Sequence, residues 1–440
     1  MKNILIGLVV ILPLLTQAQK QITIENISDG TFDQESFAGL NWMNDGQFYT
    51  ALISNQIVKF DVSTRKKVAV LVDGKNLKIS IDDYEFSKDE SKIILLTDKK
   101  SIYRRSFTGE YYLYTIANKL LKKVSSRGRQ SYVSFSPDSK KLAFVRDNNL
   151  FFMDTDEMFE FPLTEDGKVG SIINGSSDWV YEEEFSLTKA FEWSPDGMKI
   201  AYLRFNESEV KEYNLQYWDE GAKYPRDYRY KYPKTGEKNA QVSVQIFDLD
   251  KKKKVQVDLG KETDVYIPRI QWTKNPNLLS VIQLSRLQNR LNVFHADAST
   301  GKALVAFYER AEKYLDVTES CDLFYLDNKT HFIFSSTERH GFKHFYLHNI
   351  DGQHVGPITD GNWEVDQFIG VDQTKKTPEL YYTSTEDSPL ERHVYKIDIY
   401  GKGKTKLSIA PGMNSVDMSK DFKYYFLNHT SSTRPLSVTL

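Results

Sequence analysis

Several features that define common protein classes are scarce or missing in this sequence. Cys321 is the only cysteine, so no disulfide can form within the chain, and it is expected to be a small buried hydrophobe. Lys plus Arg number 58 and Asp plus Glu 60, so the basic excess typical of nucleic-acid-binding proteins is absent. No G-x-S-x-G, H-E-x-x-H, paired-cysteine metal site, Walker loop or G-x-G-x-x-G occurs. We therefore expect no metal, no nucleotide or other cofactor, and no nucleic-acid partner.

The histidines give little support for a metal site. The chain has eight of them, and they are scattered. His340 and His344 are four residues apart in ERHGFKHFYL, a stretch that predicts a hairpin. We expect both to be surface polar residues, with metal binding as the alternative.

One long apolar run occurs, and it lies at the N-terminus. Ile4 to Leu15 follows Lys2, and Thr16-Gln17-Ala18 forms a small-residue cleavage site. This pattern predicts a secretory signal peptide over residues 1–18, because the run is shorter than the roughly 20 residues that span a membrane. The mature chain is then secreted or periplasmic and keeps no membrane span. A retained membrane anchor is the alternative.

A phrase recurs along the rest of the chain. It consists of an apolar residue, Ser or a similar small polar residue, a turn, and an alternating apolar run, as in FSKDESKIILL, FSPDSKKLAFV and WSPDGMKIAYL. Its eight copies start at Trp42, Phe86, Phe135, Trp193, Trp272, Leu326, Val371 and Met418. The intervals between these residues are 44, 49, 58, 79, 54, 45 and 47. Such self-similarity at a fixed period is typical of a repeat architecture.

Between the copies lies a second phrase that predicts a strand-turn-strand hairpin. Examples are IVKFDVSTRKKVAVLV and VQIFDLDKKKKVQVD, and the turn of the second, Lys251 to Lys254, is expected to be a solvated hairpin tip. Two hairpins per period of about 45 residues are typical of a four-stranded propeller blade. The sequence therefore predicts an all-β fold, a β-propeller of about eight four-stranded blades over residues 39–440, with a lead-in segment over residues 19–38.

The repeat departs from its period at two places. The 79-residue interval holds an insertion, Arg204 to Val244, rich in Tyr and Pro, and insertions of this kind tend to be functional or contact surfaces. RPLSVTL at the end of the sequence predicts a third strand of the eighth blade, with no fourth strand before Leu440. Natural proteins avoid such open sheet edges, so we expect the chain to be a fragment of a longer protein.

The stretch DWVYEEEF, Asp178 to Phe185, sets three glutamates within an aromatic frame. Carboxylates this close raise one another's pKa unless a cation compensates. Aromatic walls lower the local dielectric and so strengthen the attraction of a cation that enters. A primary ammonium carries three N–H donors and fits two or three carboxylates. Glu183 and Glu184 are therefore candidates for binding the free N-terminus of a peptide. The alternative is an acidic loop that pairs with a neighbouring Lys or Arg.

These residues also carry a family resemblance. D-W-V-Y-E-E-E resembles the double-Glu motif in the N-terminal β-propeller of the dipeptidyl peptidase IV family, of the prolyl oligopeptidase class of serine peptidases. FEWSPDGMKIAYLRFNESEV and YKYPKTGEKN follow in the family's order, the latter with the Y-P-K-x-G signature, and ITDGNWEV resembles a later family phrase. The resemblance covers nearly the whole mature chain. The sequence departs from the family pattern after the Y-P-K-x-G signature, where Asn239 is followed by Ala240 instead of the family's usual proline.

The resemblance implies roles for three residues. Glu183 and Glu184 match the glutamates that bind the substrate's α-ammonium in the family. YRRSFTGEYYLY resembles the family's R-x-S-[YF]-T segment, whose arginine binds the substrate's backbone carbonyl. The resemblance implies this role for Arg104. The spacing from the preceding copy of the repeat favours Arg104 over Arg105. An exposed hairpin charge is the alternative for Arg104. The family's Ser, Asp and His triad lies in an α/β-hydrolase domain that is absent from this chain, so no catalytic residue is expected here and the chain alone should be inactive.

The implied function is that of the substrate-gating propeller of a secreted serine dipeptidyl peptidase, which releases X-Pro or X-Ala dipeptides from peptide N-termini. The partners are then peptides with a free N-terminus, and the resemblance allows a homodimer of the full-length protein. Two alternatives stay open. One is the propeller of a prolyl tripeptidyl peptidase, and the other is a non-catalytic propeller that binds peptides or proteins.

Overall fold

The computed structural model describes residues 22–33, 39–317, 323–339 and 341–440. The chain divides into two compact units, Met1–Phe37 and Ala38–Leu440. In the first unit the described residues form one short helix, α1 (Ile24–Ser28), capped by Thr23. The predicted signal peptide, Cys321 and His340 lie outside the described residues. No helix in the described ranges has the length and apolarity to cross a membrane.

The described strands of Ala38–Leu440 form nine antiparallel sheets, of which eight are numbered here as blades 1 to 8 and the ninth is a two-stranded hairpin. Blade 1 holds β1 (Asn41–Trp42), β2 (Phe48–Ile53), β3 (Gln56–Asp61) and β4 (Lys67–Asp73), followed by α2 (Gly74–Leu77). Blade 2 holds β5 (Asp83–Phe86), β6 (Lys92–Ser101), β7 (Phe107–Thr115) and β8 (Leu120–Lys123). Blade 3 holds β9 (Ser131–Phe135), β10 (Lys141–Arg146), β11 (Asn149–Asp154) and β12 (Glu160–Pro162). Blade 4 holds β13 (Ile172–Asn174), β14 (Phe191–Trp193), β15 (Lys199–Asn206), β18 (Gln241–Asp248) and β19 (Lys253–Gln256).

The second half of the ring is more regular. Blade 5 holds β20 (Val265–Trp272), β21 (Leu278–Ser285), β22 (Arg290–Asp297) and β23 (Ala303–Arg310). Blade 6 holds β24 (Leu323–Tyr325), β25 (His331–Ser336), β26 (His344–Asn349) and β27 (His354–Pro357). Blade 7 holds β28 (Val365–Asp372), β29 (Glu379–Ser384), β30 (His393–Asp398) and β31 (Thr405–Lys406). Blade 8 has three strands, β32 (Met413–Met418), β33 (Tyr425–Ser431) and β34 (Arg434–Thr439), as the sequence predicts.

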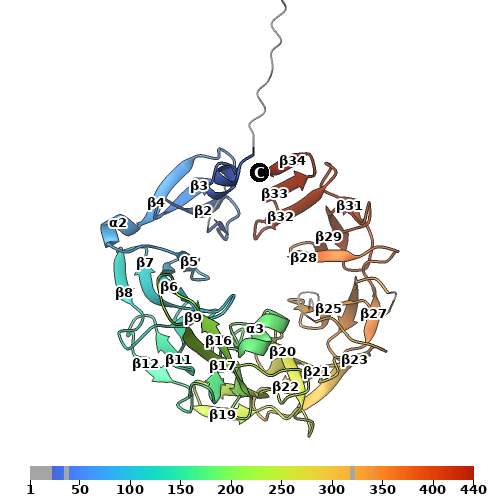
Figure 1. Ribbon diagram of the computed structural model, residues 1–440. Coiled ribbons are helices and arrows are strands. Elements are labelled where there is room, and N and C mark those ends of the chain that lie inside the picture. Colours follow the sequence, from blue (N-terminus) through green and yellow to red (C-terminus); the bar gives the residue numbers. More distant parts are fainter. Residues whose placement is uncertain (1–21, 34–38, 318–322, 340) are drawn as a thin grey trace, which may run out of the picture. The chain divides into compact units, whose positions relative to one another are not determined.

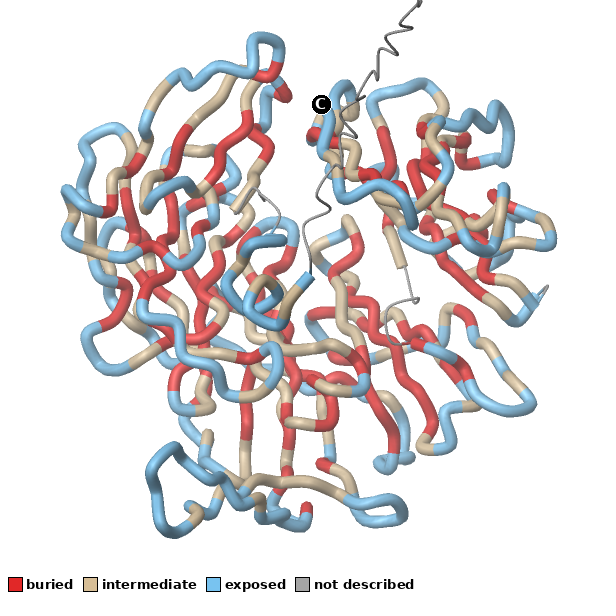
Figure 2. Tube along the Cα trace, turned by 45° about the horizontal axis from the view of Figure 1, so that its top comes forward, coloured by how far each residue is buried: buried red, intermediate tan, exposed pale blue. Residues whose placement is uncertain are grey.

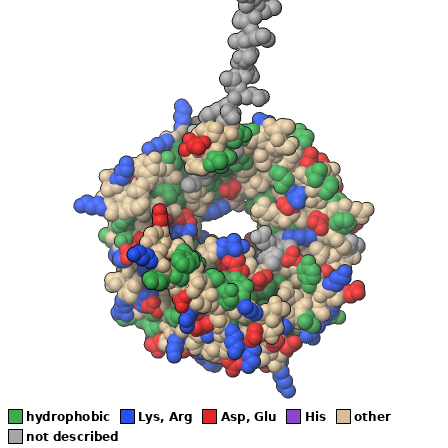
Figure 3. All heavy atoms as spheres, in the orientation of Figure 1, with side chains coloured by type: hydrophobic (Ala, Val, Ile, Leu, Met, Phe, Trp, Pro, Cys, Tyr) green, Lys and Arg blue, Asp and Glu red, His purple; other side chains and the backbone are tan. Residues whose placement is uncertain are grey.

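The sheets of this unit follow one another around a ring, from blue blade 1 to red blade 8 (Figure 1), with an opening at its middle (Figure 3). Buried residues follow the strands and exposed residues form the connecting loops (Figure 2). The ring is closed by apolar packing of blade 8 on blade 1. Trp42 packs on Phe426 with ring centroids 5.0 Å apart and the rings tilted by 40°, and its Nε1–H donates to Asp417 at 3.0 Å. The predicted eight-bladed β-propeller is therefore confirmed.

The recurring phrase of the sequence is the turn between the first and second strands of a blade. Ser194 follows the last residue of β14, and its hydroxyl accepts the N–H of Lys199 at 2.9 Å and donates to Asp196. Ser136 after β9 accepts the N–H of Lys141 in the same way, also at 2.9 Å. A buried serine that binds its own turn explains why this small polar residue returns in most copies.

Blade 4 departs from the standard blade twice, and both departures account for the long sequence intervals. The inner edge of β15 is shared by two short strands, β13 and β14, and the chain between them forms helix α3 (Trp179–Phe185). A separate two-stranded hairpin, β16 (Glu212–Tyr217) and β17 (Arg226–Lys231), lies between β15 and β18. The run of Lys251 to Lys254 is exposed at the turn of β18 and β19, which confirms the predicted solvated tip.

The expectation of a surface position for His344 is wrong. This residue begins β26 and is 0% exposed. Its Nε2 lies 3.0 Å from the carbonyl oxygen of Gly361, and its Nδ1 lies 3.0 Å from the hydroxyl of Thr359. The ring is buried because the segment after β27 folds over the start of β26 and satisfies both nitrogens, which local sequence could not reveal.

Candidate functional site

The acidic stretch folds as helix α3, at the inner margin of the ring in the view of Figure 1. Asp178 is its N-cap, and the Asp178 carboxylate accepts the N–H of Tyr181 at 3.0 Å. The helix ends at Phe185, and its C-cap Ser186 has a left-handed φ of 51°. Tyr181 and Phe185 are four residues apart on one helix face, are 1% and 2% exposed, and pack together with ring centroids 5.2 Å apart. These two aromatic residues therefore anchor the helix in the core.

The three glutamates of α3 point in different directions, because successive side chains on an α-helix are rotated by about 100°. Glu182 is 1% exposed, and its carboxylate accepts the backbone N–H groups of Arg105 at 2.6 Å and Ser106 at 2.9 Å. Glu183 is half-buried and accepts hydrogen bonds from Arg104. Glu184 is exposed and has no ion pair or hydrogen bond in the described ranges of the chain.

The structure brings Arg104 and Glu183 together from blades 2 and 4. Arg104 lies in the loop between β6 and β7, and its Nε is 2.9 Å and 3.2 Å from the two carboxylate oxygens of Glu183. The arginine side chain is 70% exposed and that of Glu183 is 18% exposed. Arg105 adds a longer ion pair, with its Nη1 4.0 Å from Glu183. An ion pair with so exposed an arginine contributes little to folding stability.

A cavity of about 1450 Å³ opens beside α3 and takes in Glu184. Its aromatic wall comes from α3 and the blade 4 insertion, and Trp179 packs on Tyr232 with ring centroids 4.3 Å apart. The Y-P-K-x-G signature, residues 232–236, lines the same cavity, as does Arg286 of blade 5. Of the three predicted site residues only Glu184 lines this cavity, while Glu183 and Arg104 face each other outside it.

Two buried carboxylates lie beneath the site. Burial raises the pKa of Asp178 to about 7, the nearby Glu207 carboxylate adds to the rise, and the N–H of Tyr181 opposes it. Burial also raises the pKa of Glu207, and Lys231 of the insertion hairpin opposes that rise. The helix that carries the glutamates is therefore capped by a group that titrates near neutral pH.

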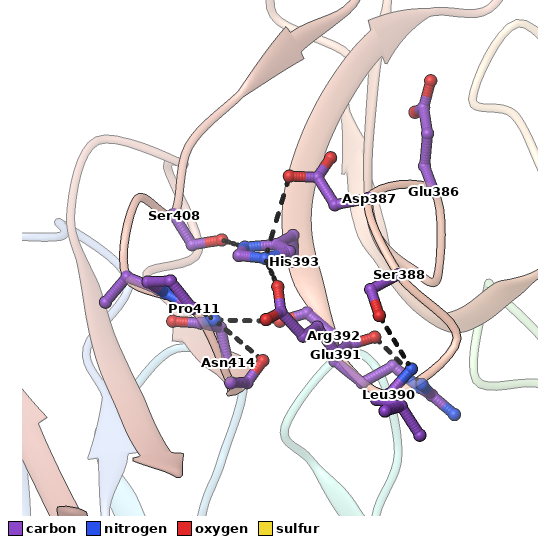
Figure 4. Close-up of polar contacts among 12 residues, drawn as sticks. Glu386, Asp387, Ser388, Leu390, Glu391, Arg392, His393, Ser408, Pro411 and Asn414 are labelled. Carbon is purple, nitrogen blue, oxygen red and sulfur yellow. Dashed lines mark hydrogen bonds and ion pairs between the residues drawn. The ribbon is translucent and has the colours of Figure 1, made fainter.

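A second polar cluster, in blade 7, resembles a catalytic arrangement but is structural (Figure 4). His393 lies between Ser408, 3.0 Å from Nδ1, and Glu391, 2.9 Å from Nε2. Ser408 is 1% exposed, and its hydroxyl already accepts the N–H of Val394 at 3.0 Å. The same geometry recurs in blade 6 with His344 and a threonine. A buried hydroxyl that repeats from blade to blade organises the start of a strand and is no nucleophile.

Sequence reasoning missed the buried partners of the site. Glu182 was present in the motif but received no role, and Asp178 was not recognised as a helix cap. One signal was available, because Tyr181 and Phe185 have helical spacing and three consecutive glutamates on a helix cannot share one face. The described residues contain no group of three His, Cys, Asp or Glu side chains arranged to hold a metal ion.

The fold defines an eight-bladed β-propeller, with an acidic helix and a tyrosine-rich hairpin inserted in its fourth blade. The family described as "Dipeptidyl peptidase IV (DPP IV) N-terminal region" matches residues 87–436, and the chain belongs to this family. The crystal structure of Porphyromonas gingivalis dipeptidyl peptidase 4 superposes with a TM-score of 0.89 at 35% identity, covering 96% of this chain and 60% of that one.

Curated relatives carry related names. The chain is 28% identical to a probable dipeptidyl peptidase 4 of Aspergillus flavus, over 80% of this chain and 49% of that protein. It is 27% identical to prolyl endopeptidase FAP of Mus musculus, over 87% of this chain and 51% of that protein. It is 30% identical to a probable dipeptidyl-aminopeptidase B of Aspergillus niger, over 84% of this chain and 44% of that protein. The chain thus spans about half the length of the curated relatives it matches.

Proposed function

We propose that this chain is the substrate-gating propeller of a secreted or periplasmic serine dipeptidyl peptidase that releases X-Pro or X-Ala dipeptides. Residues 1–18 act as its signal peptide, residues 19–38 lead into the propeller, and residues 39–440 form it. The nucleophile belongs to a hydrolase domain outside this chain, so the chain alone does not hydrolyse peptides. The names of the relatives, dipeptidyl peptidase and dipeptidyl-aminopeptidase, support this assignment.

One observation carries the proposal. Helix α3 presents two adjacent carboxylates, of which Glu183 already holds a cation, the Arg104 guanidinium, and Glu184 is unpaired beside a large cavity. An α-ammonium has three N–H donors and suits such a pair of acceptors. A guanidinium has five donors in a planar fork, so Arg104 has donors left for a substrate carbonyl while it contacts Glu183.

Glu183 and Glu184 then determine how far from the peptide's N-terminus cleavage occurs. A peptide whose α-ammonium is held by Glu183 and Glu184, and whose first carbonyl accepts from Arg104, has its N-terminal residue fixed on the propeller. Only a peptide bond at a set distance from that end can then reach the nucleophile of the hydrolase domain. Fixing the reacting bond in this way supplies catalysis through orientation.

The length of the released fragment tests the proposal. The full-length gene product should release dipeptides from peptides with proline at the second position, and should leave the same peptides intact when their N-terminus is acetylated. Mass spectrometry of the products measures both. Tripeptides from substrates with proline at the third position would assign the propeller to a tripeptidyl peptidase, and no cleavage of any of these peptides would leave a binding propeller.

A further inference from the structure

We propose that Glu182, the buried first glutamate of the triplet, is a positioning residue. It holds the blade 2 loop that carries Arg104 in the position where Arg104 pairs with Glu183 of blade 4. This inference rests on the proposed function, because it concerns the same site. It assigns Glu182 a role different from that of its two neighbours. Glu182 does not contact the ligand, and instead sets the place of the arginine that does.

The contacts of Glu182 go to the blade 2 loop that carries Arg104. One carboxylate oxygen accepts two consecutive backbone N–H groups, those of Arg105 at 2.6 Å and Ser106 at 2.9 Å. The guanidinium of Arg105 returns a hydrogen bond to the backbone oxygen of Glu182 at 3.1 Å. Three hydrogen bonds therefore join residues of one helix on blade 4 to one loop on blade 2, with blade 3 between them in the chain.

The loop that receives these bonds is closed on itself through Ser106. The N–H of Ile102 donates to the Ser106 carbonyl at 2.8 Å, and the N–H of Tyr103 donates to the Ser106 hydroxyl at 3.2 Å. Since the Ser106 N–H goes to Glu182, the glutamate ties the backbone of this closed loop to α3, while Tyr103 adds a ring contact with Tyr230 at 5.9 Å. Arg104 lies inside the loop, so its backbone position follows from the same contact.

Arg104 has little else to hold it. Its side chain is 70% exposed, and its hydrogen bonds in the described chain go to Glu183. An exposed ion pair of this kind is weak and does not fix a loop by itself. Glu182, 1% exposed, has the opposite properties, because hydrogen bonds to a buried carboxylate are strong and directional. An apolar side chain could fill the same space but could not orient two backbone N–H groups.

The test uses the full-length gene product with an X-Pro amide substrate that has a free N-terminus. Glu182→Ala should raise KM about 10-fold or more while kcat changes less, and hydrogen exchange of residues 104–106 should accelerate. Glu182→Gln keeps an oxygen acceptor without the charge and should give an intermediate KM. Glu160→Ala is the matched control, because it removes a carboxylate that is 9% exposed and pairs with Arg146 at 2.8 Å within blade 3. It should lower stability and leave KM unchanged.

A double-mutant cycle separates positioning from general damage. If Glu182 acts through Arg104, then Glu182→Ala should add little to the rise in KM in a chain that already carries Arg104→Ala. Additive losses would overturn the proposal, as would a wild-type KM in Glu182→Ala. Should Glu182→Ala fail to fold, a wild-type KM and wild-type exchange in Glu182→Gln would overturn it instead. The proposed function fails separately, when the unmodified protein cleaves acetylated and free peptides alike, whatever exchange shows in the loop.

Discussion

Replacing Glu183 or Glu184 by glutamine should lower kcat/KM of the full-length gene product for X-Pro substrates by about 100-fold or more. Either change leaves the substrate ammonium with one charged acceptor instead of two in a partly desolvated site. Removing one partner of a buried charge pair costs about 3 kcal/mol or more, and each 1.36 kcal/mol is tenfold in rate. Steady-state kinetics on a chromogenic X-Pro amide measure the effect.

Glu209→Gln is the matched control for this experiment. Glu209 also lines the cavity and is exposed, but it pairs with Lys238 at 2.6 Å and plays no part in the proposed clamp. Its replacement changes the charge of the cavity by the same amount and should leave kcat/KM within a few-fold of the unmodified protein. An unchanged kcat/KM in either Glu183→Gln or Glu184→Gln would contradict the proposal that these two glutamates bind the substrate ammonium.

Asp178→Asn should stabilise the protein above neutral pH and remove part of its pH dependence. The pKa of Asp178 is about 7 in the folded protein, against 3.8 for the free side chain, because burial and Glu207 disfavour the carboxylate. A group whose folded pKa is raised contributes stability below its unfolded pKa and loses that stability as pH rises to the folded pKa. The loss develops between about pH 4 and pH 7 and amounts to at most about 4 kcal/mol, at 1.36 kcal/mol per pKa unit.

Urea unfolding at pH 4 and pH 8 provides the measurement. Asparagine keeps the side-chain oxygen that caps α3, since it is as good an N-cap as aspartate. The two proteins should therefore have similar stability at pH 4, and Asp178→Asn should be the more stable at pH 8. Asp196→Asn is the control, because this aspartate is in an exposed turn and binds its own loop. A loss of stability at pH 8 in Asp178→Asn would show that the carboxylate charge itself supports the helix.

The repeat was readable from the sequence because its cause is local. The serine at position 194 and its equivalents bind turns only a few residues away, so the hydrogen bonds leave a short pattern that returns once per blade. The alternation of the hairpins is local too, because successive residues of a strand point to opposite faces of its sheet. The incomplete eighth sheet was predicted in the same way, by counting the strands that follow the last copy of the repeat.

The site could be predicted only in outline. The motif named Glu183, Glu184 and Arg104, but the contacts that position them join residues 76 to 79 apart in the chain. No local pattern states which of three consecutive glutamates is buried, because that depends on a loop supplied by another blade. His344 was wrongly expected at the surface for the same reason, since its partners come from a segment beyond the next strand.

The central claim is that the two glutamates hold a peptide's α-ammonium, and binding tests it most directly. Isothermal titration would compare a tripeptide with a free N-terminus and its N-acetylated form, both added to the 440-residue chain at neutral pH. The account predicts binding of the free peptide alone, and loss of this preference in Glu183→Gln and Glu184→Gln. Equal affinity for the free and acetylated peptides, or a preference that survives both substitutions, would contradict it.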